Sequence, residues 1–204
     1  MSNPQTLRFF RSKLPHWLVA GRAYFVTIRL KGTLPAHILE QLKQQQEDSE
    51  KSDIEKRRNL FVKIEHFLDA SNASVRLLDN REVADMLLES LPWFESKGWT
   101  IYAAVVLSTH MHLLIRNMQG ASDKLISHVS AFKSYTGGRA NKILDRRGRF
   151  WAHDCFDVWI RTPDKFESTV CYIANNPVKA GHVKCWTDWP WVQVHDDVLF
   201  CLKN

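Results

Sequence analysis

The sequence predicts an α+β domain in which an antiparallel sheet carries helices on its faces. Its 204 residues include 45% hydrophobic and 25% charged residues, the proportions of a globular protein. A chain of this length makes one domain with a substantial core. Runs of β-branched and aromatic residues alternate with helical patterns in the order strand, helix, helix, strand, strand, helix, short strand, helix. This order favours an α+β arrangement.

In the first half of the chain, one strand precedes the helical regions. The strand is expected over 23–30 (AYFVTIRL), which alternates and is rich in β-branched and aromatic residues. Residues 36–69 have a helical pattern, although 44–58 is almost wholly polar and forms either a solvated helix face or a loop between two helices. A further helix is expected over 80–97.

The second half contains two strands, a helix, a short extended piece and a final helix, expected over 99–107, 110–116, 123–144, 156–161 and 164–176. The first of these helices is weakened by Gly137 and Gly138. The final helix starts from a cap at Asp164. It should stop near Asn176, because the residue before Pro177 disfavours helical backbone angles.

The chain divides into a basic N-terminal arm (1–20), a central domain (21–183) and a tail (184–204) that holds three tryptophans. No apolar run approaches the roughly 20 residues needed to cross a bilayer, and the N-terminus lacks the apolar stretch of a secretory signal. The four cysteines form no CxxC pair. This spacing argues against a thiolate zinc site and favours reduced thiols in a cytosolic protein.

Two histidines, His110 and His112, flank Met111 inside a predicted strand. Side chains at i and i+2 lie on the same face of a strand, roughly 6.5 Å apart, so both imidazoles can reach one metal ion while Met111 points into the core. The pattern alone also fits two half-exposed strand histidines, since a chain with nine histidines often contains such a pair by chance.

Tyr172 and Asn176 are four residues apart in a predicted helix and therefore lie on one helical face. Taken alone, they could be a core tyrosine and a residue that ends the helix. Combined with His110 and His112, the amide oxygen of Asn176 would complete a three-point site suited to a divalent ion such as Mg²⁺ or Mn²⁺. Tyr172 could then attack a phosphodiester whose oxygens the metal polarises.

These motifs resemble the REP-associated tyrosine transposases, relatives of the single-tyrosine HUH transposases of small insertion sequences. The resemblance covers most of the chain and keeps the order and spacing of seven blocks: LPHW (14–17), YFVTIRL (24–30), VVLSTHMHLLI (105–115), FKSYT (132–136), GRFWAHDCFDVWIR (148–161), YIANNPVKAGHV (172–183) and DWPW (188–191). His110 and His112 match the family's metal-binding histidines, Tyr172 its nucleophile and Asn176 its third metal ligand.

The resemblance implies a ferredoxin-like α+β fold with both histidines on a central strand. It implies an enzyme that nicks single-stranded DNA beside hairpins of REP-type palindromes through a covalent 5′-phosphotyrosine. It also implies a bacterial, cytoplasmic, nucleoid-associated protein that acts as a monomer or homodimer. Cys155 and Val158 depart from the larger or charged residues of relatives, which puts the sequence preference in doubt, and the polar stretch 44–58 indicates an inserted helix pair.

A second tyrosine, Tyr135, is an alternative nucleophile because it lies among cations on a helix after the histidine strand. Its neighbour at i+4, Arg139, cannot bind a metal. Tyr172 is therefore the preferred nucleophile.

Positive charge is concentrated in residues 121–149, whose net charge of +5 accounts for most of the +6 of the whole chain. Such a concentration predicts salt-dependent contacts with phosphates. The candidate DNA-binding residues in and beside this region are Lys133, Arg139, Lys142, Arg146, Arg147, Arg149 and, for base stacking, Trp151. The arm adds a second cluster that includes Arg11, Lys13 and His16.

Three functions remain open at this point. The first is a metal-dependent single-strand DNA endonuclease and strand-transferase that acts through Tyr172. The second is a domesticated protein that holds hairpin nucleic acid without cutting it, although such a binder has no need of the histidine, tyrosine and asparagine pattern. The third is a hydrolytic nuclease in which water attacks, so that no covalent adduct forms.

Overall fold

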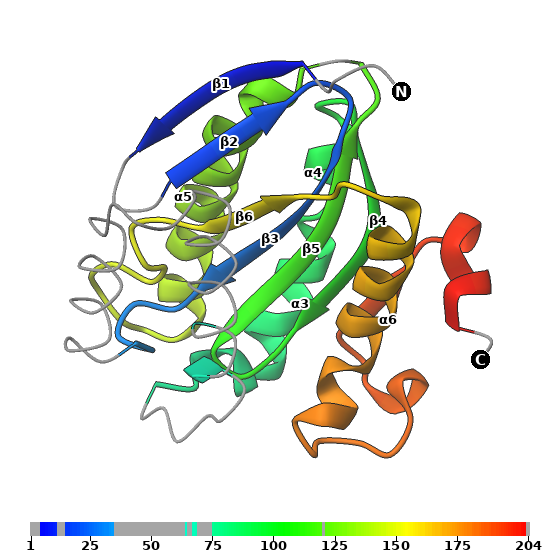
Figure 1. Cartoon of the computed structure of the whole chain (residues 1–204). Helices are drawn as coiled ribbons and strands as arrows, with labels where there is room; N and C mark the ends of the chain where they lie inside the picture. Colours follow the sequence, from blue (N-terminus) through cyan, green and yellow to red (C-terminus); the bar gives the residue numbers. More distant parts are fainter. Residues whose placement is uncertain are drawn as a thin grey trace.

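The computed structural model describes residues 5–11, 15–34, 64, 67, 68, 75–119 and 121–202. A five-stranded antiparallel sheet forms its centre, in the order β6-β3-β5-β4-β7. The strands of this sheet are β3 (Ala23–Arg29), β4 (Trp99–Val106), β5 (His110–Asn117), β6 (Phe156–Trp159) and β7 (Val192–Val194). The predicted α+β class with an antiparallel sheet is confirmed (Figure 1).

Helices cover both faces of the sheet (Figure 1). One face packs against α3 (Arg81–Glu89), α4 (Pro92–Glu95) and α5 (Leu125–Ile143). Its core joins Val26 and Met111 of the sheet to Phe94 and Phe132 of the helices. The other face packs against α6 (Pro163–Lys179), and its core includes Phe25, Leu114 and Ile173. Short 3-10 turns η1 to η4 lie at Leu77–Asp79, Ser122–Lys124, Trp186–Asp188 and Asp196–Leu202.

The N-terminal arm forms a β-hairpin of β1 (Thr6–Arg11) and β2 (Pro15–Val19), which is a separate two-stranded sheet. Figure 1 shows the hairpin beside the β6 edge of the main sheet. The tail supplies β7, which pairs with β4 at the opposite edge. Two tail tryptophans hold this edge, since the Trp189 indole donates to the Val106 carbonyl (3.0 Å) and the Trp191 indole to Asp85 (2.9 Å).

The structure corrects where one predicted helix is divided and where the final helix is capped. The helix expected over 80–97 is divided into α3 and α4, because Pro92 begins a new turn and the Ser90 hydroxyl donates to the Met86 carbonyl. The final helix is capped by Thr162, which accepts from the Lys165 amide, and not by Asp164. The predicted 36–69 helical region lies mostly outside the described residues.

The prediction that the final helix stops at Asn176 is wrong, because α6 continues through Pro177 to Lys179. The proline removes one amide donor, but the following bonds, from the Ala180 amide to the Asn176 carbonyl and from the His182 amide to the Pro177 carbonyl, are made. Asn176 and Pro177 are both buried. Burial of this last turn offsets the local preference against helix before proline.

No helix among the described residues is both long and apolar enough to cross a membrane.

Candidate active site

The two histidines lie side by side on the central strand β5, which pairs with β3 on one side and β4 on the other. Met111 and Leu113 point to the face covered by α3, α4 and α5. Because neighbouring side chains on a strand point to opposite faces, His110 and His112 point to the face covered by α6. Both imidazoles are buried, with 1% and 0% of their surface exposed.

The His110 and His112 rings converge through their Nε2 atoms, which are 3.0 Å apart. The other ring nitrogens face threonine hydroxyls: His110 Nδ1 lies 2.8 Å from Thr109 Oγ1, and His112 Nδ1 lies 3.0 Å from Thr27 Oγ1. When each Nδ1–H donates to its threonine, both Nε2 lone pairs point to one place. Two lone pairs at this distance repel each other unless a cation or a proton lies between them.

Tyr172 reaches this pair from α6. Its ring centroid lies 5.8 Å from that of His112 and 5.9 Å from that of Phe25. Two turns further along the helix, Lys179 places its Nζ 5.4 Å from the Tyr172 ring. Tyr172 is partly exposed. A phenol beside two histidines, with a cation close by, is an arrangement that suits attack on a negatively charged phosphodiester.

The contacts of α6 with the sheet predict that Asn176 lies near the level of His110. Near the start of the helix, Phe166 contacts Tyr102, with 4.9 Å between the ring centroids, and Tyr102 lies beside Leu114 and Ile115 of β5. Further along the helix, Tyr172 contacts His112. The helix therefore descends β5 toward its beginning. The next turn advances about 6 Å, and two strand residues span about 6.6 Å. By these spacings, Asn176, one turn after Tyr172, is expected opposite the start of β5.

Asn176 is buried, with 1% of its surface exposed, and neither its Oδ1 nor its Nδ2 has a hydrogen-bond partner in the part of the chain that the structure describes. A buried amide without partners costs about 1–3 kcal/mol. Nothing in its described surroundings offsets this cost. A ligand that accepts the Oδ1 lone pair would account for it.

These residues fit a divalent metal ion. Two ligands at right angles and about 2.1 Å from one ion lie about 3.0 Å apart, which is the Nε2–Nε2 distance between His110 and His112. Among the described residues, no three His, Cys, Asp or Glu side chains gather into a metal cluster. A third protein ligand would therefore be the amide of Asn176, and His₂Asn with open positions suits Mg²⁺ or Mn²⁺.

The alternative nucleophile lies elsewhere. Tyr135 is on α5, against the opposite face of the sheet from the histidines, and is 58% exposed. Its hydroxyl accepts from Arg139 at 3.3 Å. The sheet separates Tyr135 from His110 and His112, so the structure brings only Tyr172 to the histidine pair.

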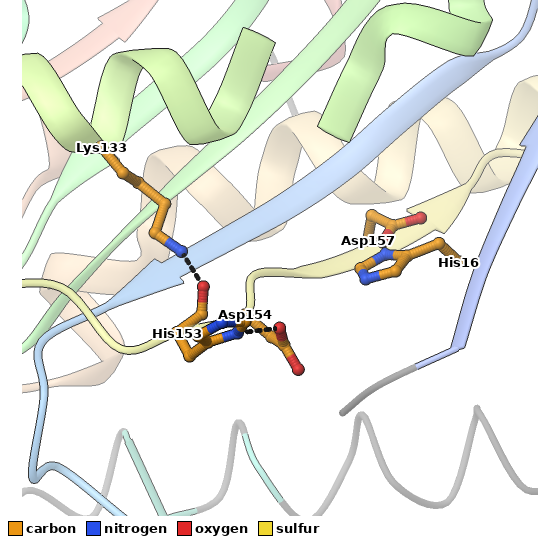
Figure 2. Close-up of polar contacts among 5 residues, drawn as sticks. All are labelled: His16, Lys133, His153, Asp154 and Asp157. Atoms are coloured by element: carbon orange, nitrogen blue, oxygen red, sulfur yellow. Dashed lines mark hydrogen bonds and ion pairs between the residues drawn. The ribbon is translucent and has the colours of Figure 1, made fainter. Parts of the chain in front are cut away.

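Most of the predicted DNA-binding residues lie along α5 and the turn after it. Arg139, Lys142, Arg147 and Arg149 are exposed, whereas Arg146 is half-buried over the Phe150 ring. A groove of about 430 Å³ between α5 and residues 148–153 is lined in part by Lys133 and Arg149. Lys133 Nζ donates to the His153 carbonyl at 2.6 Å (Figure 2), and its burial lowers its pKa from the usual value.

Two predicted DNA contacts are corrected by the structure. Trp151 is only 3% exposed and its indole donates to Thr136 Oγ1, so it presents no free ring face to a base. His16 is 2% exposed and pairs with the buried Asp157 (Figure 2). Lys13 and the side chain of Arg11 lie outside the described parts. Among the cysteines, Cys155 is buried, and this burial raises its pKa to about 12.

The sequence analysis missed three residues that the structure places at or near the site: Thr27, Arg29 and Phe25. Thr27 and Arg29 lie opposite His112 and His110 in the β3–β5 register. Their alternation within the predicted strand 23–30 was visible in the sequence. Only the tertiary structure shows that this strand pairs with β5, which places Thr27 and Arg29 beside the histidines.

Comparison with known proteins gives two matches and one negative result. No family model matches the chain. Over 105 residues the chain is 34% identical to a REP-associated tyrosine transposase of Escherichia coli (strain K12), and this stretch covers 52% of the chain and 57% of that protein. The match thus spans little more than half the length of the curated relative.

A solved structure described as a REP-associated tyrosine transposase bound to a REP hairpin covers 95% of this chain and 89% of its own, with a TM-score of 0.57 and 20% sequence identity. At that identity the likeness concerns the fold, which both chains share along most of their length. The two matches agree with the resemblance carried by the seven sequence blocks: the chain is similar to a REP-associated tyrosine transposase in sequence over about half of its length, and to another in fold over most of it.

Proposed function

We propose that this protein is a metal-dependent single-strand DNA endonuclease and strand-transferase that acts at REP-type hairpins through a covalent 5′-phosphotyrosine. The observation that carries the proposal is the position of Tyr172, whose ring lies beside His112 while His110 and His112 converge through Nε2. The sequence relative is a REP-associated tyrosine transposase, and the structural relative was solved with a REP hairpin. Bacterial hairpin DNA in the cytoplasm is the substrate that we infer.

In the proposed reaction, the Tyr172 oxygen attacks the phosphorus of a DNA phosphodiester. A bond forms between phosphorus and the tyrosine oxygen, and the bond between phosphorus and the 3′-oxygen breaks. The phenolic proton is lost to solvent and the 3′-oxygen leaves as a hydroxyl after taking up a proton. The phosphotyrosine keeps the free energy of the broken ester, so attack by another 3′-hydroxyl rejoins DNA without ATP.

His110, His112 and Asn176 would hold the divalent ion, which when bound polarises a phosphoryl oxygen. The hydroxyls of Thr109 and Thr27 accept hydrogen bonds from the Nδ1–H groups of His110 and His112. These bonds orient the two rings so that both Nε2 atoms point to one place. Phe25 contacts both His112 and Tyr172 (4.9 and 5.9 Å between ring centroids) and fills the space between strand and helix. The rigid sheet and α6 thereby preorganise the nucleophile against the metal ligands.

The proposal predicts a covalent protein–DNA adduct. Wild-type protein mixed with end-labelled single-stranded DNA that carries a REP-type hairpin and its flanking bases, with Mn²⁺ or Mg²⁺, should give an adduct that survives SDS electrophoresis. Tyr172→Phe removes the attacking oxygen and should abolish the adduct, and His110→Ala or EDTA should reduce it by at least about 100-fold.

Tyr135→Phe is the matched control, because Tyr135 is the more exposed tyrosine and lies on the far side of the sheet. It should leave the adduct unchanged. An adduct lost in Tyr135→Phe and kept in Tyr172→Phe would contradict the assignment of the nucleophile. Cleavage without any adduct would indicate water as the nucleophile, and tight hairpin binding without cleavage would indicate a domesticated binder.

A further inference from the structure

Arg29 is the last residue of β3, and its position in the sheet places it beside the histidine pair. The β3–β5 register sets Arg29 opposite His110, as it sets Thr27 opposite His112. Thr27 shows which face is involved, because its hydroxyl reaches His112 Nδ1. Residues i and i+2 share a face, and directly opposed residues have Cβ atoms about 4.5–5.5 Å apart. Arg29 therefore leaves the sheet on the His110 side of the pair.

Arg29 is half-buried beside the histidine pair. In the described part of the chain its guanidinium makes no hydrogen bond or ion pair. Burial lowers its pKa to about 10, and the charge of Asp154 opposes that effect without closing an ion pair. A partly desolvated cation whose N–H groups are not all bonded to the protein favours the binding of an anion.

The N–H groups of Arg29 indicate which kind of anion it would bind. Arginine presents planar, paired N–H groups that match two oxygens of a phosphate, and it stays charged at any physiological pH. The neighbouring His110 is one of the two convergent imidazoles, and Tyr172 reaches the other. An anion bound by Arg29 would thus lie at the site of the proposed reaction and not at a remote surface.

We propose that Arg29 binds the phosphodiester group that Tyr172 attacks, by donating to its non-bridging oxygens from the His110 side. This inference rests on the proposed function and names the residue that recognises the reacting phosphate. The phosphorus gains negative charge on its equatorial oxygens as Tyr172 attacks. Arg29 should therefore stabilise the transition state more than it stabilises the bound substrate.

The test combines a variant of Arg29 with the neutralisation of a single phosphate. Binding is measured in the Tyr172→Phe background, so that no cleavage occurs, on hairpin DNA whose scissile phosphate is either normal or a neutral methylphosphonate. With Arg29 present, neutralising this phosphate should weaken binding by about tenfold. Arg29→Gln should weaken binding to normal DNA by a similar factor, and methylphosphonate should then cause no further loss.

Arg116 provides the matched control, because it lies on the same face of β5 at the other end of the strand, about 20 Å from His110, and is exposed. Arg116→Gln removes the same charge and should keep the tenfold sensitivity to methylphosphonate. If Arg29→Gln remains as sensitive as the parent, the proposal is wrong. If Arg29→Gln does not fold, Arg29→Lys replaces it. This variant should show at most about threefold sensitivity to methylphosphonate, because lysine lacks the paired N–H groups of the guanidinium. Full sensitivity would again reject the proposal.

The outcome separates this proposal from the proposed function, because binding needs no catalysis. A wild-type protein that forms an adduct, with full methylphosphonate sensitivity in Arg29→Gln, would leave the function standing and reject the role of Arg29. A wild-type protein that forms no adduct, with sensitivity lost in Arg29→Gln, would reject the chemistry and retain Arg29 as a phosphate-binding residue.

Discussion

Asn176 has a side chain that the fold alone does not explain. Its amide is buried and lacks a hydrogen-bond partner among the described residues, at the end of a helix that continues through a proline. Sites that bind or react with ligands often carry such a local cost, since a group positioned for a ligand is not satisfied by the protein itself. The same amide of Asn176 therefore lowers the stability of the metal-free protein and is proposed to support its activity.

Asn176→Leu should make the protein more stable and less active. Leucine has a similar volume and no polar atoms, so the metal-free free energy of unfolding should rise by about 1 kcal/mol. The rate of adduct formation should fall by about tenfold or more, and the stabilisation by Mn²⁺ seen in the wild type should shrink. Urea unfolding in EDTA and in Mn²⁺ measures both effects.

The neighbouring Asn175 is the control, because it is exposed and its Nδ2 donates to the Cys171 carbonyl. Asn175→Leu should change stability by less than about 0.5 kcal/mol and leave the adduct intact. A clear loss of stability in Asn176→Leu without metal would show that the amide has a structural partner, and would remove the argument for a ligand role.

At the scale of the element, α5 shows how one helix tolerates two adjacent glycines. The helix runs unbroken from Leu125 to Ile143 through Gly137 and Gly138. A Cβ at Gly137 would lie 3.3 Å from the Phe150 Cβ, so a side chain there would have to displace the following segment slightly. A Cβ at Gly138 would meet nothing within 4 Å. Packing thus explains the first glycine and not the second.

The two glycines should respond differently to the same substitution. Gly138→Ala should stabilise the protein by about 0.5–1 kcal/mol, since alanine favours helix and finds open space. Gly137→Ala should give no gain and is expected to be destabilising by about 1 kcal/mol, because its Cβ presses on Phe150. Thermal or urea unfolding compares the pair, and equal effects would mean that the 148–153 segment yields easily to the added methyl group.

At the scale of the whole molecule, one of the buried contacts that join the N-terminal hairpin to the sheet is a pair of titratable side chains. His16 of β2 pairs with Asp157 of β6, and both side chains are buried (Figure 2). His153 and Asp154 form a similar pair a few residues away, in which His153 is 54% exposed and Asp154 is 9% exposed. Burial makes the first pair a constraint on how the hairpin sits, because removing one member takes a hydrogen-bonding partner away from a side chain that is shielded from water.

Breaking the buried pair should cost far more than breaking the exposed one. His16→Ala leaves Asp157 without this partner and should destabilise the protein by about 3 kcal/mol. His153→Ala should cost less than about 1 kcal/mol. The double variant His16→Leu with Asp157→Leu should recover part of the loss, since no buried charge remains. Urea unfolding measures all three, and equal effects of His16→Ala and His153→Ala would show that the hairpin is held by other contacts.

The basic groups and the histidine site lie on opposite faces of the sheet, and the two faces meet at the end of β3. Arg29 there interacts electrostatically with Asp154 and Lys133, and Lys133 lies on α5. A nucleic acid that contacts both α5 and Tyr172 has to pass around this edge. The predicted concentration of positive charge over 121–149 was visible in the sequence, but its separation from the histidines was not.

The sequence by itself determined the α+β class and the strands that carry the candidate site, and it predicted His110, His112, Tyr172 and Asn176 as a set, because strand alternation and helical spacing are local properties. It also determined the family resemblance, through the order of its seven blocks.

Only the tertiary structure decided which residues meet. The packing of its last turn lets α6 continue through Pro177. Trp151 and His16 are buried, and Tyr135 lies on the face of the sheet opposite the histidines. Strand register brought Arg29 opposite His110. These outcomes depend on contacts between segments distant in the chain, whose packing free energy exceeds the local preferences of single residues.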